Sequence, residues 1–183
     1  MTNVQTVPSV QDATEEDAVA VAQIYAHYVL NSAASFEDVA PDAGAMAERM
    51  RQVLRQGYPW LVARDGAHGV VGFAFATRFG PLAGYAYSCE THIYVAPGSV
   101  GRGVGTALIN ALTATCEARG YRQAFALIAG TEPAAVVLHA RAGYLPSGTL
   151  ASAGWKQGRW VDVFVMQRKL GAGSETLPEG HAS

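Results

Sequence analysis

The sequence has few of the features that mark metal-binding, disulfide-rich, membrane or nucleic-acid-binding proteins. Only two of its 183 residues are cysteines, and Cys89 and Cys116 form no Cys-x-x-Cys pair or Cys/His cluster, which argues against a zinc site or a disulfide framework. No apolar run reaches membrane-spanning length, and the N-terminus lacks the basic and apolar regions of a signal peptide. A formal net charge of −2 argues against a duplex nucleic-acid binder, which would usually show a basic face.

What is present is typical of one globular domain. Half of the residues are apolar and 15% are charged, and a chain of this length buries roughly two-thirds of its unfolded surface, enough to fold without a metal or disulfide. We expect a soluble, cytoplasmic protein with one domain over residues 8–170 and flexible termini at 1–7 and 171–183.

The hydrophobic pattern predicts helices first and then one mixed sheet with helices packed on its faces, which is an α+β order. Thr14 and the acidic run after it are typical of a helix start, and that helix is expected to end near Asn31. Further helices are expected at 42–56, 103–119 and 132–142. Strands are expected at 9–12, 58–63, 70–76, 85–95, 123–128, 144–150 and 160–167.

A cluster of glycines joins the predicted strand 85–95 to the helix that follows it. The first amides of a helix have no internal partner and carry partial positive charge, so glycines there let a phosphate approach the backbone. The alternative is that these glycines only form a tight turn. No Gly-Lys-Ser/Thr is present, and the spacing is GxGxG rather than GxGxxG, so a P-loop is excluded and a Rossmann site is disfavoured. We favour phosphate or pyrophosphate binding.

Glu90 is the one carboxylate in an otherwise apolar strand. Side chains alternate in a strand, so Glu90 shares a face with His92 and Tyr94, whereas Cys89 faces the other way and is interpreted as core. Partial burial raises the pKa of such a carboxyl group towards values useful for a general base. An exposed or ion-paired glutamate is the alternative, and the position in the sequence alone leaves both open. His139, on a short apolar helix, is by itself more typical of a hydrogen-bonded packing residue.

Together these features resemble the GCN5-related N-acetyltransferase (GNAT) superfamily, and within it the phosphinothricin / methionine sulfoximine acetyltransferase branch. The glycine cluster is similar to the superfamily motif (Gln/Arg)-x-x-Gly-x-(Gly/Ala), which binds the pyrophosphate of acetyl-CoA. The resemblance implies a GNAT fold, with a central, mixed, mostly antiparallel sheet of about seven strands flanked by about four helices. Segments that resemble the branch lie in the same order over residues 9–168, at 24–29, 34–37, 58–63, 90–95, 138–144 and 154–167.

The resemblance also implies an activity and its residues. It implies an acetyl-CoA-dependent N-acetyltransferase without a metal, acting on a small-molecule amine such as an amino acid or its analogue. Glu90 would be the general base, and His139 the acid that protonates the leaving thiolate or an orienting hydrogen-bond partner. The strand would part from its neighbour beyond Tyr94, so that backbone groups of Ile93, Tyr94 and Val95 pair with pantetheine. The pyrophosphate would be held by Val100, Gly101, Arg102, Gly103, Val104, Gly105 and Thr106.

The sequence departs from the branch at several positions. Val100 replaces the leading Gln/Arg of the glycine motif, and Glu132 replaces the asparagine that usually touches the cofactor. Gly80 and Ala86 stand where the branch places arginines that bind the acid groups of the substrate. These differences suggest a smaller or more apolar amine, in a pocket formed by Phe36, Trp60, Arg78 and Tyr85.

Two other functions stay open. The changes at Val100 and Glu132 are consistent with a non-catalytic acyl-CoA-binding sensor or regulator. A protein-lysine acetyltransferase would need an open peptide groove, and the aromatic-rich segments argue against one. The predicted strand 160–167 is apolar on both faces, which, with the habit of the branch, predicts a homodimer; no nucleic-acid or membrane partner is expected.

Overall fold

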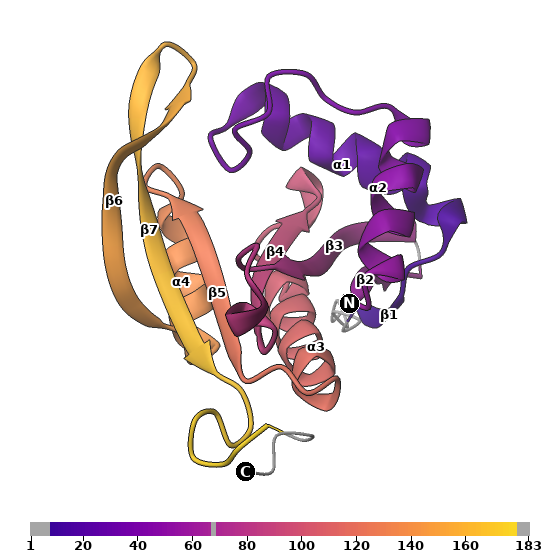
Figure 1. Cartoon of the computed structure of the whole chain (residues 1–183). Coiled ribbons are helices and arrows are strands. Elements are labelled where there is room, and N and C mark those ends of the chain that lie inside the picture. The colour runs from indigo at the N-terminus through magenta and orange to yellow at the C-terminus, as the bar shows by residue number, and fades with distance from the viewer. Residues whose placement is uncertain (1–7, 67–68, 179–183) are drawn as a thin grey trace, which may run out of the picture.

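A single sheet of seven strands, in the order β1-β2-β3-β4-β5-β7-β6, runs through the computed structural model, which describes residues 8–66 and 69–178 (Figure 1). All neighbouring strands are antiparallel except β4 and β5, which are parallel. The strands are β1 (Ser9–Asp12), β2 (Trp60–Asp65), β3 (Gly69–Arg78), β4 (Ser88–Val95), β5 (Gln123–Ala129), β6 (Leu145–Lys156) and β7 (Arg159–Lys169). The helices are α1 (Ala18–Asn31), α2 (Ala43–Arg55), α3 (Val104–Ala118) and α4 (Pro133–Arg141). The predicted fold class is confirmed.

The helices cover both faces of the sheet. Tyr25 of α1 packs against Phe73 of β3, with ring centroids 6.4 Å apart. Gly72 directly precedes Phe73 in β3, and a Cβ atom at Gly72 would lie 3.0 Å from the Leu108 side chain of α3. Because neighbouring residues of a strand point to opposite faces, α1 and α3 lie on opposite sides. We call these the α1 face and the α3 face.

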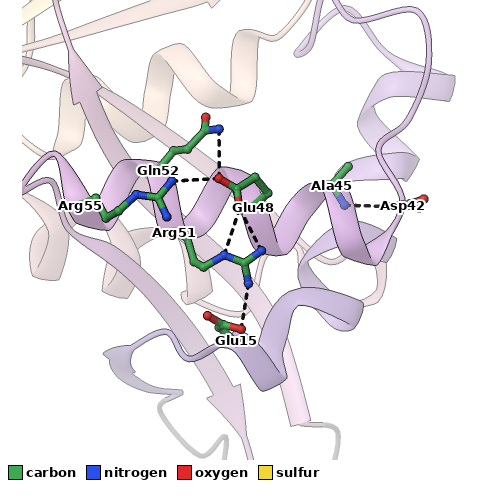
Figure 2. Close-up of polar contacts among 7 residues, drawn as sticks. All are labelled: Glu15, Asp42, Ala45, Glu48, Arg51, Gln52 and Arg55. Carbon is green, nitrogen blue, oxygen red and sulfur yellow. Dashed lines mark hydrogen bonds and ion pairs between the residues drawn. The ribbon is translucent and has the colours of Figure 1, made fainter.

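The first helical segments are fixed by polar contacts, of which the sequence pattern indicated the helix start at Thr14. Thr14 and Asp17 form a capping box, as a helix start of this kind predicts, although the first turn (Glu15–Asp17) is a 3-10 helix. At the start of α2, the side chain of Asp42 accepts a hydrogen bond from the Ala45 amide at 2.8 Å (Figure 2). Figure 2 also shows Arg51 reaching from Glu48 of its own helix to Glu15, which ties α2 to the first turn.

A row of stacked aromatic rings forms the core on the α1 face. Trp60, Phe75 and Phe73 lie nearly parallel, with the Trp60 and Phe75 centroids 4.1 Å apart. Phe75 stacks in turn on His92, at 4.5 Å. This rigid layer fixes the β3 and β4 side chains from which the site is built.

The element boundaries differ from the predicted ones mainly around β4 and in the last hairpin. Strand β4 begins at Ser88, because Ala83–Tyr85 forms a 3-10 turn in which the Ala86 amide donates to the Ala83 carbonyl. Strands β6 and β7 are longer than predicted and project as a hairpin at one edge of the molecule (Figure 1). Residues 67–68, between the predicted strands 58–63 and 70–76, lie outside the described residues.

Part of the tail that the sequence predicts to be flexible is in contact with the domain. Lys169 pairs with Glu175 at 2.5 Å, and Arg122 donates to the Thr176 hydroxyl at 3.1 Å. The other expected flexible residues, 1–7 and 179–183, lie outside the described residues. In the part of the chain that is described, no helix is long and apolar enough to cross a lipid bilayer.

Candidate active site

The parallel pairing of β4 with β5 stops after three residues. It runs from Ser88↔Gln123 to Glu90↔Phe125, whereas β4 stays paired with β3 as far as Val95↔Gly72. The sequence prediction that the strands part beyond Tyr94 is therefore wrong in position, because they part directly after Glu90 (Figure 1).

Where β4 and β5 separate, a side-chain hydrogen bond takes the place of their main-chain hydrogen bonds. The Thr91 hydroxyl donates to the Phe125 carbonyl at 3.0 Å and so satisfies an acceptor that β4 no longer reaches. Its oxygen is 3.0 Å from the Tyr144 hydroxyl, which is left as the donor in that contact. The opening is thus held by a short buried network.

A cavity of about 80 Å³ occupies the space between the parted strands. Its walls come from both faces of the sheet, since His92, Tyr94 and Leu127 belong to the α1 face and Thr91 and Ala126 to the α3 face. Ala34 closes it on one side, and Glu132, Ala135 and His139 on the other. We call this cavity, which is lined from both faces of the sheet, the slot.

Glu90 lies on the α1 face at the last paired position, next to the slot. Its side chain is only 19% exposed, and burial raises the pKa of its carboxyl group. Its Oε1 atom is 3.7 Å from Nε2 of His92, a residue that lines the slot. A carboxylate with these properties is suited to accept a proton at neutral pH.

His92 is a site residue that sequence reasoning placed on the correct face but gave no role. Its Nε2 is 3.0 Å from the Thr77 hydroxyl on β3, opposite Glu90. Burial first, and then the positive charge of Arg49, lower the pKa of His92 to about 4, so the ring is neutral at pH 7. Its contact with Thr77 depends on pairing between distant strands, and no pattern in the sequence shows it.

His139 lines the slot from α4 and is 5% exposed. Its Nδ1 is 2.8 Å from the Ala135 carbonyl, and since a carbonyl only accepts, Nδ1 carries the hydrogen. Burial lowers the pKa of His139, so Nε2 keeps a lone pair, and it is buried without a partner. In this state His139 offers an acceptor. The geometry therefore argues against the predicted acid role and favours the orienting hydrogen bond.

The glycine cluster lies where α3 begins. Gly101 and Gly103 have φ of 80° and 79°, a backbone region in which a side chain is strained. Val104 is buried, so only its main chain is available at this surface. Arg102, Thr106 and the first two glycines are exposed, as is Val100. Gly105 packs closely, since a Cβ there would be 3.1 Å from Leu138 of α4. The start of α3 thus lies beside α4, and amides at a helix start are able to bind phosphate.

The open edge of β4 is only partly free. The ladder with β3 uses the main-chain groups of alternate residues, which leaves those of Ile93 and Val95 facing the opening. The Tyr28 hydroxyl donates to the Val95 carbonyl at 2.6 Å and lies 3.4 Å from the Val95 amide. Tyr94, whose main chain pairs with β3, places its ring against Tyr25 and Tyr28 of α1.

The four predicted pocket residues do not gather in one place. Tyr85 is 44% exposed and packs on Phe79, near Glu90. Phe36 is half-exposed against Gly154 of β6. Trp60 is fully buried behind Phe75, so it belongs to the core layer. Arg78 follows Thr77 at the end of β3, so its side chain leaves the sheet on the other face. It is exposed and points away from the Glu90 carboxylate.

Glu132 precedes α4 and lines the slot. Its charge contributes to raising the pKa of Tyr28, after burial, so the two residues lie near each other across the opening. Within residues 8–66 and 69–178, no three His, Cys, Asp or Glu side chains gather to hold a metal ion.

Three features indicate the class of protein. A pair of parallel strands separates, a carboxylate lies where the strands separate, and a glycine-rich segment begins the next helix. Residues 15–144 match the Acetyltransferase (GNAT) family, and this chain belongs to that family. The chain is 42% identical to the phosphinothricin N-acetyltransferase of Alcaligenes faecalis, over 93% of this chain and 87% of the relative. It is 33% identical to the L-methionine sulfoximine/L-methionine sulfone acetyltransferase of Pseudomonas aeruginosa PAO1, over 88% and 94% of the two chains.

Solved structures show the same fold. The GNAT superfamily phosphinothricin acetyltransferase of Sinorhizobium meliloti in complex with AcCoA superposes with a TM-score of 0.91 at 36% identity, covering 96% of this chain and 95% of that one. The structure of yncA, a putative acetyltransferase from Salmonella typhimurium with its cofactor acetyl-CoA, has a TM-score of 0.89 at 28% identity, over 94% and 98%.

Proposed function

We propose that this protein transfers the acetyl group of acetyl-CoA to the amino group of an amino acid or amino acid analogue, of the phosphinothricin or methionine sulfoximine/sulfone type. One observation carries the proposal: the slot, which is lined from both faces of the sheet, lies next to a partly buried carboxylate, Glu90. A thioester entering from the α3 face would meet an amine held on the α1 face. The names and bound acetyl-CoA of the relatives support this assignment.

Glu90 would act as general base in a direct attack. The acceptor arrives as an ammonium ion, and Glu90 takes one proton from it. The freed nitrogen attacks the thioester carbon, a C–N bond forms, and the C–S bond breaks as the thiolate leaves. The thiolate gains a proton from the attacking nitrogen, through solvent or directly, so the sum of the reaction is an amide, a thiol and one released proton. No covalent enzyme intermediate is needed.

His139 would orient the cofactor, because it lines the slot and its buried Nε2 has no hydrogen-bond partner among the described residues, so this atom is left as an acceptor. An N–H of the pantetheine arm or the product thiol could donate to it. The main-chain groups of Ile93 would hydrogen-bond to the pantetheine arm of acetyl-CoA. Those of Val95 would do the same after the Tyr28 side chain moves away from them. The amides of residues 100–106 would take the pyrophosphate.

A thiol-release assay with acetyl-CoA tests the proposal. The panel contains the common L-amino acids, methionine sulfone, methionine sulfoximine and phosphinothricin, with calorimetry of acetyl-CoA binding as the control. We expect amine-dependent thiol release, with N-acetyl product found by mass spectrometry. Tight acetyl-CoA binding without transfer to any amine of the panel would refute the enzyme.

A non-catalytic acyl-CoA sensor is the second candidate, favoured by one observation. Glu132 brings an anion to the wall of the slot, which weakens binding of an anionic cofactor and is not needed for catalysis. A sensor would be stabilised by acetyl-CoA in a thermal shift assay yet leave it intact with every amine.

We also propose a homodimer. Strand β6 is an edge strand exposed over most of its length, and Trp155 and Trp160 of the hairpin are 55% and 64% exposed. Exposed apolar surface of this kind is typical of an interface. Light scattering should report twice the chain mass, and a monomer at micromolar concentration would refute it.

A cytoplasmic location stays a prediction from the sequence, to be checked by cell fractionation.

A further inference from the structure

A wall of three aromatic rings adjoins Glu90 on the α1 face. Phe125 is the register partner of Glu90, so both side chains leave the sheet on the same side. Phe79 stacks on Phe125 with centroids 3.9 Å apart and planes 15° from parallel. Tyr85 packs edge-on against Phe79 at 5.5 Å. We call these three residues the aromatic wall.

The wall keeps its shape because one residue within it has no side chain. A Cβ at Gly80 would lie 2.6 Å from Cδ2 of Tyr85, closer than atoms tolerate, so the Tyr85 ring fills the space that a side chain at position 80 would need. Tyr85 is 44% exposed, so the aromatic wall is accessible from solvent at this ring. Position 80 cannot carry a long side chain while Tyr85 stays in place.

Three cations on the α1 face are held by other groups. Arg49 pairs with the Glu37 carboxylate at 2.8 Å, and the buried Lys156 donates to the Glu37 main-chain carbonyl. Lys169 pairs with Glu175. An anionic group of a ligand placed against the aromatic wall would therefore meet apolar rings and the Glu90 carboxylate. Burial without a partner and repulsion from a like charge both oppose it.

From this arrangement we infer that the acceptor is a primary amine whose side chain is uncharged, either aromatic or aliphatic, and lies on the aromatic wall while its amino group faces Glu90. The inference rests on the proposed function and sharpens its substrate. Within the proposed class, an acceptor with a second acid group on its side chain, as in phosphinothricin, would be used less efficiently than one of the methionine sulfone type. Stacking and edge contacts with Phe79 and Phe125 would favour a flat or branched apolar group.

The wild-type chain provides the first test, with L-phenylalanine, L-methionine sulfone and phosphinothricin as acceptors and acetyl-CoA saturating. We expect kcat/KM for both uncharged side chains to exceed that for phosphinothricin at least tenfold. Equal or better use of phosphinothricin would overturn the inference and leave the proposed function intact. Failure of all three, with the wider panel also silent, would instead remove the proposed function and this inference with it.

Two variants test the residues. Phe79→Ser should raise KM for phenylalanine about tenfold or more and change kcat little, with acetyl-CoA affinity unchanged. Adding Gly80→Arg to a Tyr85→Ala background should raise kcat/KM for phosphinothricin at least tenfold over Tyr85→Ala alone, without a gain for phenylalanine. Melting curves and acetyl-CoA calorimetry identify variants that are folded. Folded variants that leave both ratios unchanged would overturn the role of the wall.

Discussion

The first three residues of β4 and the last five differ in what lies beside them. Ser88–Glu90 is paired on both sides, with β3 and β5, whereas the rest of the strand is paired only with β3. The closed part is filled by small buried side chains such as Cys89 and Ala124. The open part borders the slot. The comparison shows that the slot forms where the pairing of β4 with β5 ends, and that Glu90, the proposed base, is the last paired residue.

The largest effect is expected at that boundary. Glu90→Gln keeps the shape of the side chain and removes its basicity, so kcat should fall about 10²- to 10⁴-fold. Acetyl-CoA affinity, measured by calorimetry, should stay within a few-fold, because the carboxylate is proposed to act on the amine. Comparable turnover in the variant would show that Glu90 is not the base.

The same substitution at two positions of β5 sharpens the contrast between the closed and open parts. Ala124 is buried against the closed part, and Ala126 lines the slot on the same face. Ala124→Leu should cost about 1–3 kcal/mol of unfolding free energy through overpacking. Ala126→Leu should be better tolerated, because its side chain can enter the slot, and should abolish acetyl-CoA binding.

Denaturant unfolding and calorimetry on both variants decide the matter. If Ala126→Leu bound acetyl-CoA as well as the wild type, the slot would not be the cofactor channel.

A smaller effect is expected at the glycine cluster. Gly103→Ala puts a side chain at φ 79°, which should cost about 1–2 kcal/mol and weaken acetyl-CoA by disturbing the first amides of α3. Gly98→Ala is the matched control, since a Cβ there meets no atom within 4 Å. Thermal melts with and without acetyl-CoA should separate the two, and equal behaviour would argue against a phosphate site.

The last effect concerns pH and stability and appears only below neutral pH. His92 has its pKa lowered to about 4 in the fold, against about 6.5 in an unfolded chain. As the pH falls from 6.5 to 4, His92 binds a proton in the unfolded chain but stays neutral in the folded protein, so the free energy of unfolding decreases. His92→Gln removes this contribution, and its melting temperature should fall less steeply over that range. Parallel curves would show that His92 is not shielded as the structure has it.

Local patterns in the sequence predicted most of the fold. Periodicity located the helices and strands, and alternation placed Glu90 and Cys89 on opposite faces. The end of the β4–β5 ladder could not be predicted, because it depends on pairing between residues more than thirty positions apart. The same reason hid the contact of His92 with Thr77. Trp60 was misplaced because a strand that is buried on both faces shows no alternation.

A crystal structure of the chain with acetyl-CoA tests the central claim most directly. The account predicts the pyrophosphate at the amides of residues 101–106, pantetheine between Ile93 and β5, and the thioester carbon in the slot within reach of an amine beside Glu90. An acetyl-CoA molecule bound elsewhere, with β4 and β5 closed by direct pairing beyond Glu90, would contradict it.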